Sequence, residues 1–360
     1  MKSRQFGPID LRKWIIQSIR AGQLRIVSSA AAQFGISRQT VHREIQEMIR
    51  QGLLTSAGNT RARQYQLPII NQFAVDMAVT PNLEEDLIWR KHIEPIFADL
   101  PPNVQLIGQH GFTEMLNNVI DHSGSVIVHL LALRTAANVS MMVSDEGIGI
   151  FKKIYMERSL EDPRHAILEL SKGRLTTDPD RHTGEGIFFT SRIFDRFAIL
   201  SGNLSLTCTP EQGDWLFDLA DWGVKVDELP SGMPGTQVLM EISAFSERSL
   251  KQVTDEFAGE DQDYSFSKTQ VPVRLARYGA EQLVSRSQAK RLLTRVTIFK
   301  EVILDFEGVE TIGQAFADEI FRVFKKDHPG THLTVSRANS QVAAMIKHVQ
   351  HSSESHFPAV

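Results

Sequence analysis

Four short motifs follow one another in the middle of the chain, each where one expected element ends or another begins, and their order limits the folds that this part can adopt. They combine carboxylate, amide and hydroxyl side chains with glycines that let a backbone approach a ligand. The motifs are a polar helix face with Glu114, Asn117, Asn118 and Asp121, the turn Asp145, Gly147 and Gly149, the helix start Thr183, Gly184 and Gly186, and the strand start Gly235 and Thr236. Taken singly, the glycine-containing turns are weak signals, since such turns are common in proteins.

Length and composition set the class of protein. The 360 residues suffice for two or three domains, and 42% hydrophobic with 23% charged residues is typical of a globular chain. The single cysteine, Cys208, can close no internal disulfide. The first ten residues lack the apolar core of a secretory signal, and no run of about 18 apolar residues could span a bilayer. We therefore expect a cytoplasmic protein that is not bound to a membrane.

Charge is distributed unevenly along the sequence. Residues 1–67 contain 11 Lys and Arg against 3 Asp and Glu, so this segment carries +8 while the remainder carries −12. A basic segment attached to an acidic body is typical of a protein that binds a polyanion through one end.

The basic segment is expected to form three helices and a hairpin. Apolar stripes predict helices over 11–19, over 28–34 and from Arg38 to Gly52, the last capped by Ser37. The run AAQFGISRQTVHREIQEMIRQGLL and the following hairpin resemble the winged helix-turn-helix of bacterial transcription regulators, which implies binding of a DNA duplex. The residues so implied are Arg38, Gln39, His42, Arg43, Arg61 and Arg63. The alternative is a three-helix interaction module with a solvated basic face.

Helices are expected over 83–100 and 104–122, after a linker or docking strand over 68–82. On a wheel of about 100° per residue, the second helix carries the four polar residues of the first motif on one side and apolar residues on the other. Magnesium takes one or two protein oxygens besides substrate phosphates, so the amide oxygen of Asn118 could serve as a metal ligand. Glu114, one turn earlier, could orient or deprotonate an attacking water or hydroxyl. The alternative is a solvated helix face.

The remaining motifs lie around strands expected over 125–133, 138–144 and 237–242. Asp145 at a strand end can accept a hydrogen bond from an exocyclic amine, and Gly147 and Gly149 leave room for a flat base. The polar segment 163–182 has the composition of a mobile lid. Gly184 and Gly186 open a helix expected over 187–194 and so expose backbone N–H groups to phosphate.

Together, the motifs from Leu83 to Ser243 resemble the GHKL ATP-binding family of gyrase, heat-shock chaperones, histidine kinases and mismatch-repair ATPases. The resemblance implies ATP and Mg²⁺ as cofactors and a mixed sheet with helices on one face. It implies Glu114 as the catalytic carboxylate, Asn118 as the metal ligand, and nucleotide contacts from Asn118, Asp145, Gly147, Gly149, Gly184, Gly186 and Thr236. From the polar helix face and the helix start themselves, we add Asn117, Asp121 and Thr183 as candidate nucleotide contacts. The stretch GEGIFFTSRIFD is similar to the anti-sigma-factor serine-kinase branch, and His92 and His110 do not stand in the context of a phosphoacceptor histidine.

After a connector over 246–262, alternating strands and helices over 263–350 predict a small α/β domain, and 351–360 a flexible tail. EVILDFEGVETIGQAFADEIFRVF resembles STAS-like domains of the uncharacterised kind fused to GHKL ATPases. Gly313, Gln314 and Ala315 offer no phosphoacceptor hydroxyl, and Thr311 has the position of a turn or cap residue. We therefore expect an interaction or sensing module, with Arg286 and Lys290 either on a solvated face or at a partner or anion site.

The sequence therefore predicts a multidomain α+β protein: a winged helix-turn-helix over 1–67, a GHKL domain over 83–245 and a STAS-like domain over 263–350. The preferred function is a nucleotide-responsive DNA-binding transcription regulator. The alternatives are a serine/threonine kinase acting on a separate partner and a scaffold with a vestigial nucleotide site. The partners expected are a DNA duplex, a protein at the STAS-like domain and a second copy in a homodimer.

Overall fold

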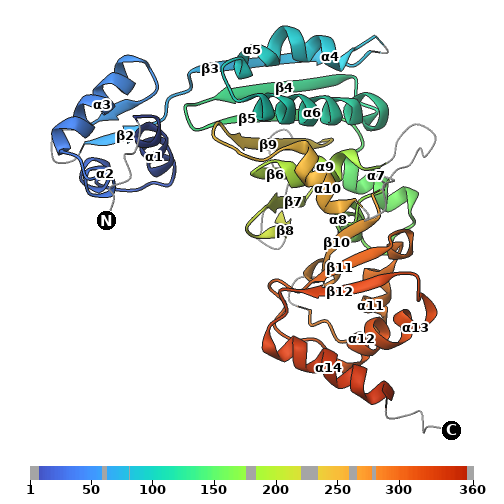
Figure 1. The fold of residues 1–360 in the computed structure, drawn as a ribbon. Helices are drawn as coiled ribbons and strands as arrows, with labels where there is room; N and C mark the ends of the chain where they lie inside the picture. The colour runs from blue at the N-terminus through green and yellow to red at the C-terminus, as the bar shows by residue number, and fades with distance from the viewer. Residues whose placement is uncertain are drawn as a thin grey trace.

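A computed structural model describes residues 8–58, 63–80, 82–175, 184–219, 234–258, 266–277 and 281–354. Arg61 and Thr183, both predicted site residues, lie outside these ranges. Figure 1 shows three bodies: a small N-terminal one, a central body built on a large sheet, and a C-terminal one below it. Within the described ranges, no helix combines the length and the apolar character that crossing a membrane requires.

The N-terminal body has three helices and a two-stranded antiparallel hairpin. These are α1 (Pro8–Arg20), α2 (Ile26–Phe34), α3 (Arg38–Arg50), β1 (Thr55–Ala57) and β2 (Gln64–Gln66). Ser37 caps α3 as predicted, since its side chain accepts a hydrogen bond from the backbone N–H of Thr40 at 3.1 Å. Ile15, Val41 and Ile45 are fully buried between the helices. The pattern of apolar stripes thus predicted this part closely.

The central body contains a seven-stranded sheet in the order β3-β4-β5-β9-β6-β7-β8. Its strands are β3 (Asn71–Ala78), β4 (Ile127–Arg134), β5 (Asn138–Asp145), β6 (Arg196–Ser201), β7 (Leu204–Thr209), β8 (Gly213–Asp218) and β9 (Gln237–Ser243). Every pairing among these strands is antiparallel, so the mixed sheet that we expected is wrong. Strand β3 lies within the expected linker over 68–82 and pairs along its length with β4.

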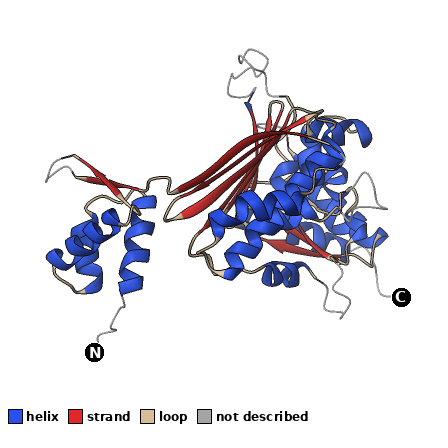
Figure 2. Ribbon diagram, turned by 90° about the horizontal axis from the view of Figure 1, so that it is seen from above, coloured by secondary structure: helices blue, strands red, loops and turns tan. Residues whose placement is uncertain are grey.

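Helices cover one face of this sheet, as expected, and Figure 2 shows them on the same side of the strands. The first helical stretch is α4 (Glu85–Ile88), a π-helical turn (Trp89–Ile93) and α5 (Glu94–Phe97). The second is α6 (Pro102–Asn118), which continues as a π-helical turn (Val119–Ser123). The others are α7 (Ile150–Glu157), α8 (Arg164–Ser171), α9 (Gly186–Ile193) and α10 (Leu250–Phe257), the last within the expected connector.

The expected lid over 163–182 is wrong for its first half. Residues Arg164–Ser171 form helix α8, in which every residue from His165 to Ser171 is buried. This helix packs against α7 and against elements of the C-terminal body. Its polar residues are therefore part of an interface.

The C-terminal body has a three-stranded parallel sheet formed by β10 (Lys268–Pro272), β11 (Glu301–Asp305) and β12 (His332–Ser336). The helices are α11 (Arg286–Leu293), α12 (Gln314–Asp318), a π-helical turn (Glu319–Phe324), α13 (Lys325–Asp327) and α14 (Ser340–Glu354), the last running into the expected tail. The parallel strands and intervening helices agree with the predicted α/β domain. Its apolar core is continuous with that of the central body, because Phe266 packs on Phe188 with ring centroids 4.6 Å apart.

The N-terminal body contacts the central sheet through α1. Arg20 pairs with Glu241 of β9, and Lys13 lies 3.6 Å from Glu247 and over the ring of Phe245. Ala136 and Ala137, in the turn between β4 and β5, belong to the apolar core of the N-terminal body. The N-terminal body is thus docked at the end of the sheet where strand β5 begins.

Candidate functional site

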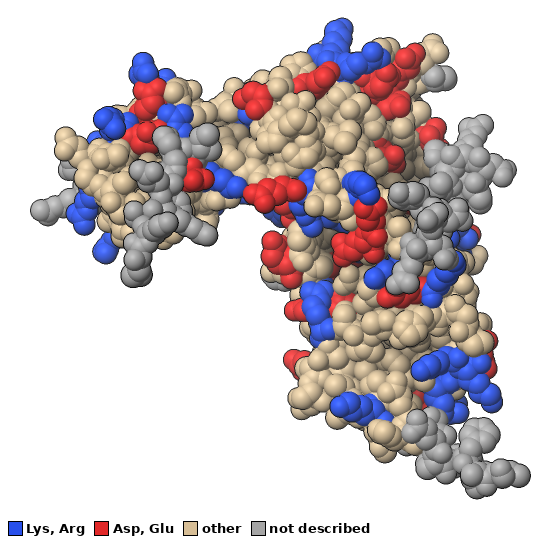
Figure 3. Space-filling view, in the orientation of Figure 1, with Lys and Arg blue, Asp and Glu red and all other residues tan. Residues whose placement is uncertain are grey.

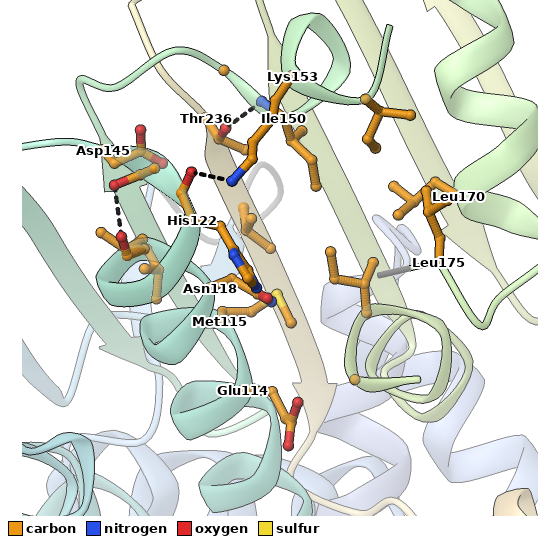
Figure 4. A pocket seen from close by; sticks show the side chains of 18 of the residues that line it. Glu114, Met115, Asn118, His122, Asp145, Ile150, Lys153, Leu170, Leu175 and Thr236 are labelled. Atoms are coloured by element: carbon orange, nitrogen blue, oxygen red, sulfur yellow. Dashed lines mark hydrogen bonds between the residues drawn. The ribbon is translucent and has the colours of Figure 1, made fainter. Parts of the chain in front are cut away.

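A cavity of about 330 Å³ lies between α6, the end of β5, α7, the start of α9 and the start of β9. Seven of the residues predicted from the sequence line it: Glu114, Asn118, Asp145, Gly149, Gly184, Gly186 and Thr236. Figure 4 shows Glu114, Asn118 and His122 along one helical stretch, with Asp145 on one side of the cavity and Leu170 and Leu175 across from it. The structure therefore brings residues from each of the four motifs to one cavity.

Helix α6 supplies Glu114 and Asn118, one turn apart, to the cavity wall. The Nδ2 atom of Asn118 is buried, with no hydrogen-bond partner among the described residues. A buried amide of this kind calls for a ligand or water, because an unsatisfied polar group is costly to bury. Asn117 and Asp121 are not among the residues that line the cavity, so their contact with a nucleotide stays a prediction. Asp121 lies in the π-helical turn, whose wider geometry rotates it away from the direction that the helical wheel gave it.

The turn after β5 holds Asp145 against the start of β9. The Asp145 side chain is only 4% exposed, and its Oδ1 accepts a hydrogen bond from the N–H of Gly147 at 2.8 Å. The N–H of Asp145 donates to the carbonyl of Thr236 at 2.9 Å. Burial raises the pKa of Asp145, while hydrogen bonds from Gly147 and Thr236 act in the opposite direction. The carboxylate is thus fixed at the cavity wall as an acceptor.

The turn requires glycine for steric reasons. Gly149 has φ +84°, and a Cβ at this position would lie 2.6 Å from the Oγ of Ser201. Gly147 is not among the lining residues, but a side chain there would overlap the carbonyl of Ser123. Gly147 therefore allows close packing beneath the cavity, and its contact with a base stays a prediction.

The start of α9 forms a further wall of the cavity, and Gly184 and Gly186 line the cavity there. The carbonyl of Gly184 accepts a hydrogen bond from the N–H of Leu175 at 3.2 Å, so this turn closes on the segment that follows α8. Helix starts present free N–H groups and a partial positive charge to an anion. Glu114 lies directly beside Gly186.

Lys153 and His122 also line the cavity, although neither was predicted from the sequence. Lys153, on α7, is the only lysine or arginine among the described lining residues, and its Nζ donates to the carbonyl of His122 at 3.0 Å. Lys153 was difficult to predict from the sequence. It lies one helical turn after Gly149, but a lysine on a short helix is usually solvated.

His110 lies one turn before Glu114 on α6. Its Nε2 atom is buried, with no hydrogen-bond partner among the described residues. Burial lowers the pKa of His110, and the charge of Glu114 acts in the opposite direction. His110 does not line the cavity, so it adds a polar neighbour behind Glu114 and no direct contact with a ligand.

The donor set fits a nucleotide better than it fits a metal ion alone. Within the described ranges, no three His, Cys, Asp or Glu side chains converge as a metal site would require. A Mg²⁺ ion at Asn118 would therefore depend on ligand oxygens, as magnesium bound with phosphates does. The cavity volume falls within the range of small-molecule pockets, and Val143, Val238 and Leu170 give it apolar walls suited to a base.

A second cleft, of about 800 Å³, lies in the N-terminal body between the α1–α2 turn, the start of α3 and β2. Arg38, His42 and Arg63, all predicted from the sequence, line it and are exposed. Arg25, which was not predicted, lines it as well. Gln39 and Arg43 are exposed on α3 outside the cleft. Figure 3 shows Lys and Arg side chains at several places around this body, with Asp and Glu among them.

In the C-terminal body, the two cations that we considered as an anion site face carboxylates. Arg286 lies 3.7 Å from Asp318, and Lys290 lies 3.9 Å from Glu319. Thr311 is exposed in the loop after β11. These ion pairs favour the interpretation of Arg286 and Lys290 as part of a solvated, ion-paired face.

Comparison with known proteins gives one finding. Residues 288–343 match the model of a family described as a STAS-like domain of unknown function (DUF4325). The match covers most of the C-terminal body, from α11 into α14. A search of curated proteins finds no match to this chain.

Proposed function

We propose that this protein is a nucleotide-responsive DNA-binding regulator, in which Mg²⁺ and ATP bound in the central cavity control the N-terminal and C-terminal bodies. The observation that carries the proposal is the convergence of Glu114, Asn118, Asp145, Gly186 and Thr236, from four separate parts of the chain, on one cavity. The resemblance of the same motifs to the GHKL family supports ATP as the ligand.

Each wall of the cavity has a role in this proposal. The buried carboxylate of Asp145 accepts a hydrogen bond from the amine of the base. The start of α9 and the Nζ of Lys153 favour the negative charge of the phosphates. The Asn118 amide oxygen coordinates Mg²⁺, and Glu114 orients or deprotonates an attacking water or hydroxyl.

The DNA-binding part of the proposal rests on the exposed face of α3 and the cleft beside it. Arg38, Gln39, His42 and Arg43 are all exposed near the start of α3. A helix carrying such residues suits the major groove, and Arg63, next to the hairpin, suits the flanking phosphates. The C-terminal body serves as the interaction or sensing module.

Calorimetric titration of the purified full-length protein with Mg²⁺ and ATP tests the nucleotide site. We expect binding by the wild type, and at least tenfold weaker binding by Asn118→Ala. Asn117→Ala is the matched control, because this neighbouring amide on the same helix does not line the cavity. Equal affinities of the two variants would remove Asn118 from the site, and the absence of heat with the folded wild type would overturn the nucleotide function.

Incubation with γ-labelled ATP distinguishes the fates of the nucleotide. Release of free phosphate identifies an ATPase switch, and stable binding without turnover identifies a sensor. Transfer of label to a separate protein would favour the serine/threonine kinase that is the alternative to a regulator.

A further inference from the structure

Lys172 is a lysine with no exposed surface, located directly after α8. Its Nζ lies 2.6 Å from Oε1 of Glu169 and donates to the carbonyl of Thr294 at 2.8 Å and to that of Arg291 at 3.3 Å. Both carbonyls lie at the end of α11, where the helix dipole attracts a cation. A residue of the central body therefore caps a helix of the C-terminal body.

The C-terminal body also contacts the central body through Arg295. Its Nη1 donates to Oε2 of Glu169 at 3.0 Å, and its Nη2 donates to the carbonyl of Arg174 at 2.5 Å. Arg295 adopts φ +60°, a left-handed conformation that a non-glycine residue keeps only where its surroundings hold it. The carbonyl of Lys172 in turn accepts a hydrogen bond from the hydroxyl of Thr269 on β10 at 2.7 Å.

The same short segment forms part of the cavity wall. Leu170 and Leu175 line the cavity, whereas Glu169, Lys172 and Arg174, between and beside them, contact the C-terminal body. Residues 169–175 are called the shared segment below. The shared segment also contacts the start of α9, because the N–H of Leu175 donates to the carbonyl of Gly184 and Arg174 lies 3.6 Å from Glu185.

The contacts of the shared segment are linked to one another by burial and by the chain. Glu169 and Lys172 are both almost completely buried, and a buried charge that loses its partner is strongly unfavourable. A shift of α11 that removed the carbonyls from Lys172 would also move Arg295 away from Glu169, since the residues are adjacent in the chain. Such an interface transmits a change between two sites if it has two discrete arrangements.

We propose that the shared segment couples the cavity to the STAS-like domain, so that the docked position of α11 sets the position of Leu170 and Leu175 and hence the affinity of the cavity for its ligand. The inference rests on the proposed nucleotide function and adds its regulation. The segment that matches the STAS-like family includes Arg291, Thr294 and Arg295. A partner that binds this domain and shifts α11 would therefore alter the affinity of the cavity for nucleotide. By linkage, nucleotide binding alters the docking of α11 by the same free energy.

Hydrogen exchange of the full-length wild type, with and without Mg²⁺ and ATP, tests this coupling without any substitution. We expect nucleotide to change the exchange rates of the backbone amides over 286–299, which lie outside the cavity lining. If nucleotide binds and those rates stay the same, the coupling is wrong while the nucleotide function stands. If the wild type binds no nucleotide, the proposed function fails and this inference with it.

The variant Lys172→Met gives a second readout. It removes the charge and keeps a long side chain, and Glu169 retains Arg295 as its partner. We expect the affinity for Mg²⁺ and ATP to change by about fivefold or more, and the nucleotide-dependent change over 286–299 to disappear. Lys251→Met is the control, because Lys251 is an exposed lysine paired within α10. An affinity and exchange pattern equal to those of Lys251→Met would overturn the proposal. Should Lys172→Met not fold, the wild-type exchange measurement decides alone.

Discussion

Glu114 of α6 and Gly186 at the start of α9 are in such close contact that position 186 has no room for a side chain. A methyl group on the Gly186 Cα would overlap Oε2 of Glu114. The two residues lie far apart in the sequence, and each was predicted separately as part of a ligand site. Their contact places the carboxylate beside the helix start that is proposed to hold phosphate.

Substitution of Gly186 by alanine is expected to displace the Glu114 side chain into the cavity. The affinity for Mg²⁺ and ATP should fall at least tenfold, while the unfolding free energy changes by only about 1 kcal/mol, because a carboxylate at the end of a flexible side chain can move aside. Calorimetry and thermal unfolding measure the two effects. Gly330→Ala, at a position with open space and an ordinary backbone conformation, is the control and should change neither. Unaltered nucleotide affinity in Gly186→Ala would contradict the proposed arrangement.

Asp145 should make nucleotide binding dependent on pH. Burial raises its pKa above the ordinary 3.8, so the carboxylate is protonated, and no longer available as a charged acceptor, as the pH falls through this raised value. We expect the affinity for ATP to decrease on acidification in the wild type and to depend less on pH in Asp145→Asn. Calorimetric titrations across the acidic range measure this. A pH profile that is the same in both proteins would exclude Asp145 from contact with the base.

The start of α3 should determine the affinity for DNA. Replacing Arg38 and Arg43 by alanine is expected to weaken binding to a duplex. The slope of log K against log salt concentration should also become less steep, by about 0.9 for each phosphate that the variant no longer neutralises. Fluorescence anisotropy with a labelled duplex at several salt concentrations measures the slope. Arg50→Ala is the control, since Arg50 lies at the other end of α3 and pairs with Glu47. Unchanged affinity and slope in the double variant would leave the N-terminal body as an interaction module.

His129 should contribute to stability only while it is protonated. Its Nδ1 lies 2.8 Å from Asp76 on β3 and its Nε2 lies 3.2 Å from Glu146 after β5, and the hydrogen bond to Asp76 is the main cause of a raised pKa, which burial opposes. Because the folded pKa lies above the unfolded value near 6.5, the contribution is complete below pH 6.5 and disappears as the pH rises through the folded pKa. The pair is partly exposed, so its magnitude is about 1 kcal/mol or less.

Denaturant unfolding of the wild type and His129→Gln at a series of pH values measures this contribution. The difference in unfolding free energy should shrink with increasing pH. His332→Gln, an exposed histidine of β12, should show no such trend. A difference that is constant with pH would show that His129 acts only by packing.

The sequence predicted best where a local signal coincides with the final contact. The cap at Ser37 and the apolar stripe of Val41 and Ile45 defined α3, and these residues pack and bond as expected. Glu114 and Asn118 were found because a polar stripe without lysine or arginine stands out on a helix. Asn117 and Asp121 are not among the residues that line the cavity; for Asp121, the wheel assumes a regular helix, and the π-helical turn at 119–123 changes the phase.

The remaining errors arise from contacts that are distant in sequence. Strand β3 forms because β4 lies beside it. The polar residues Asn71 and Gln72 at its start obscured the alternation of apolar and polar residues that is typical of a strand. Helix α8 looked like a lid because it is polar, but its buried Glu169 pairs with Lys172, and with Arg295 across an interface that no local pattern reveals. Strand direction is likewise a property of pairing, so the mixed sheet could only be assumed from a resemblance.

The most direct test of the proposed site is an experimental density map of the full-length protein purified with Mg²⁺ and ATP. We expect a nucleotide in the cavity, with its base amine at the carboxylate of Asp145, its phosphates at the start of α9 and a metal ion bound to Asn118. Density for the nucleotide outside this cavity, or a cavity without nucleotide at saturating concentration, would contradict the nucleotide function.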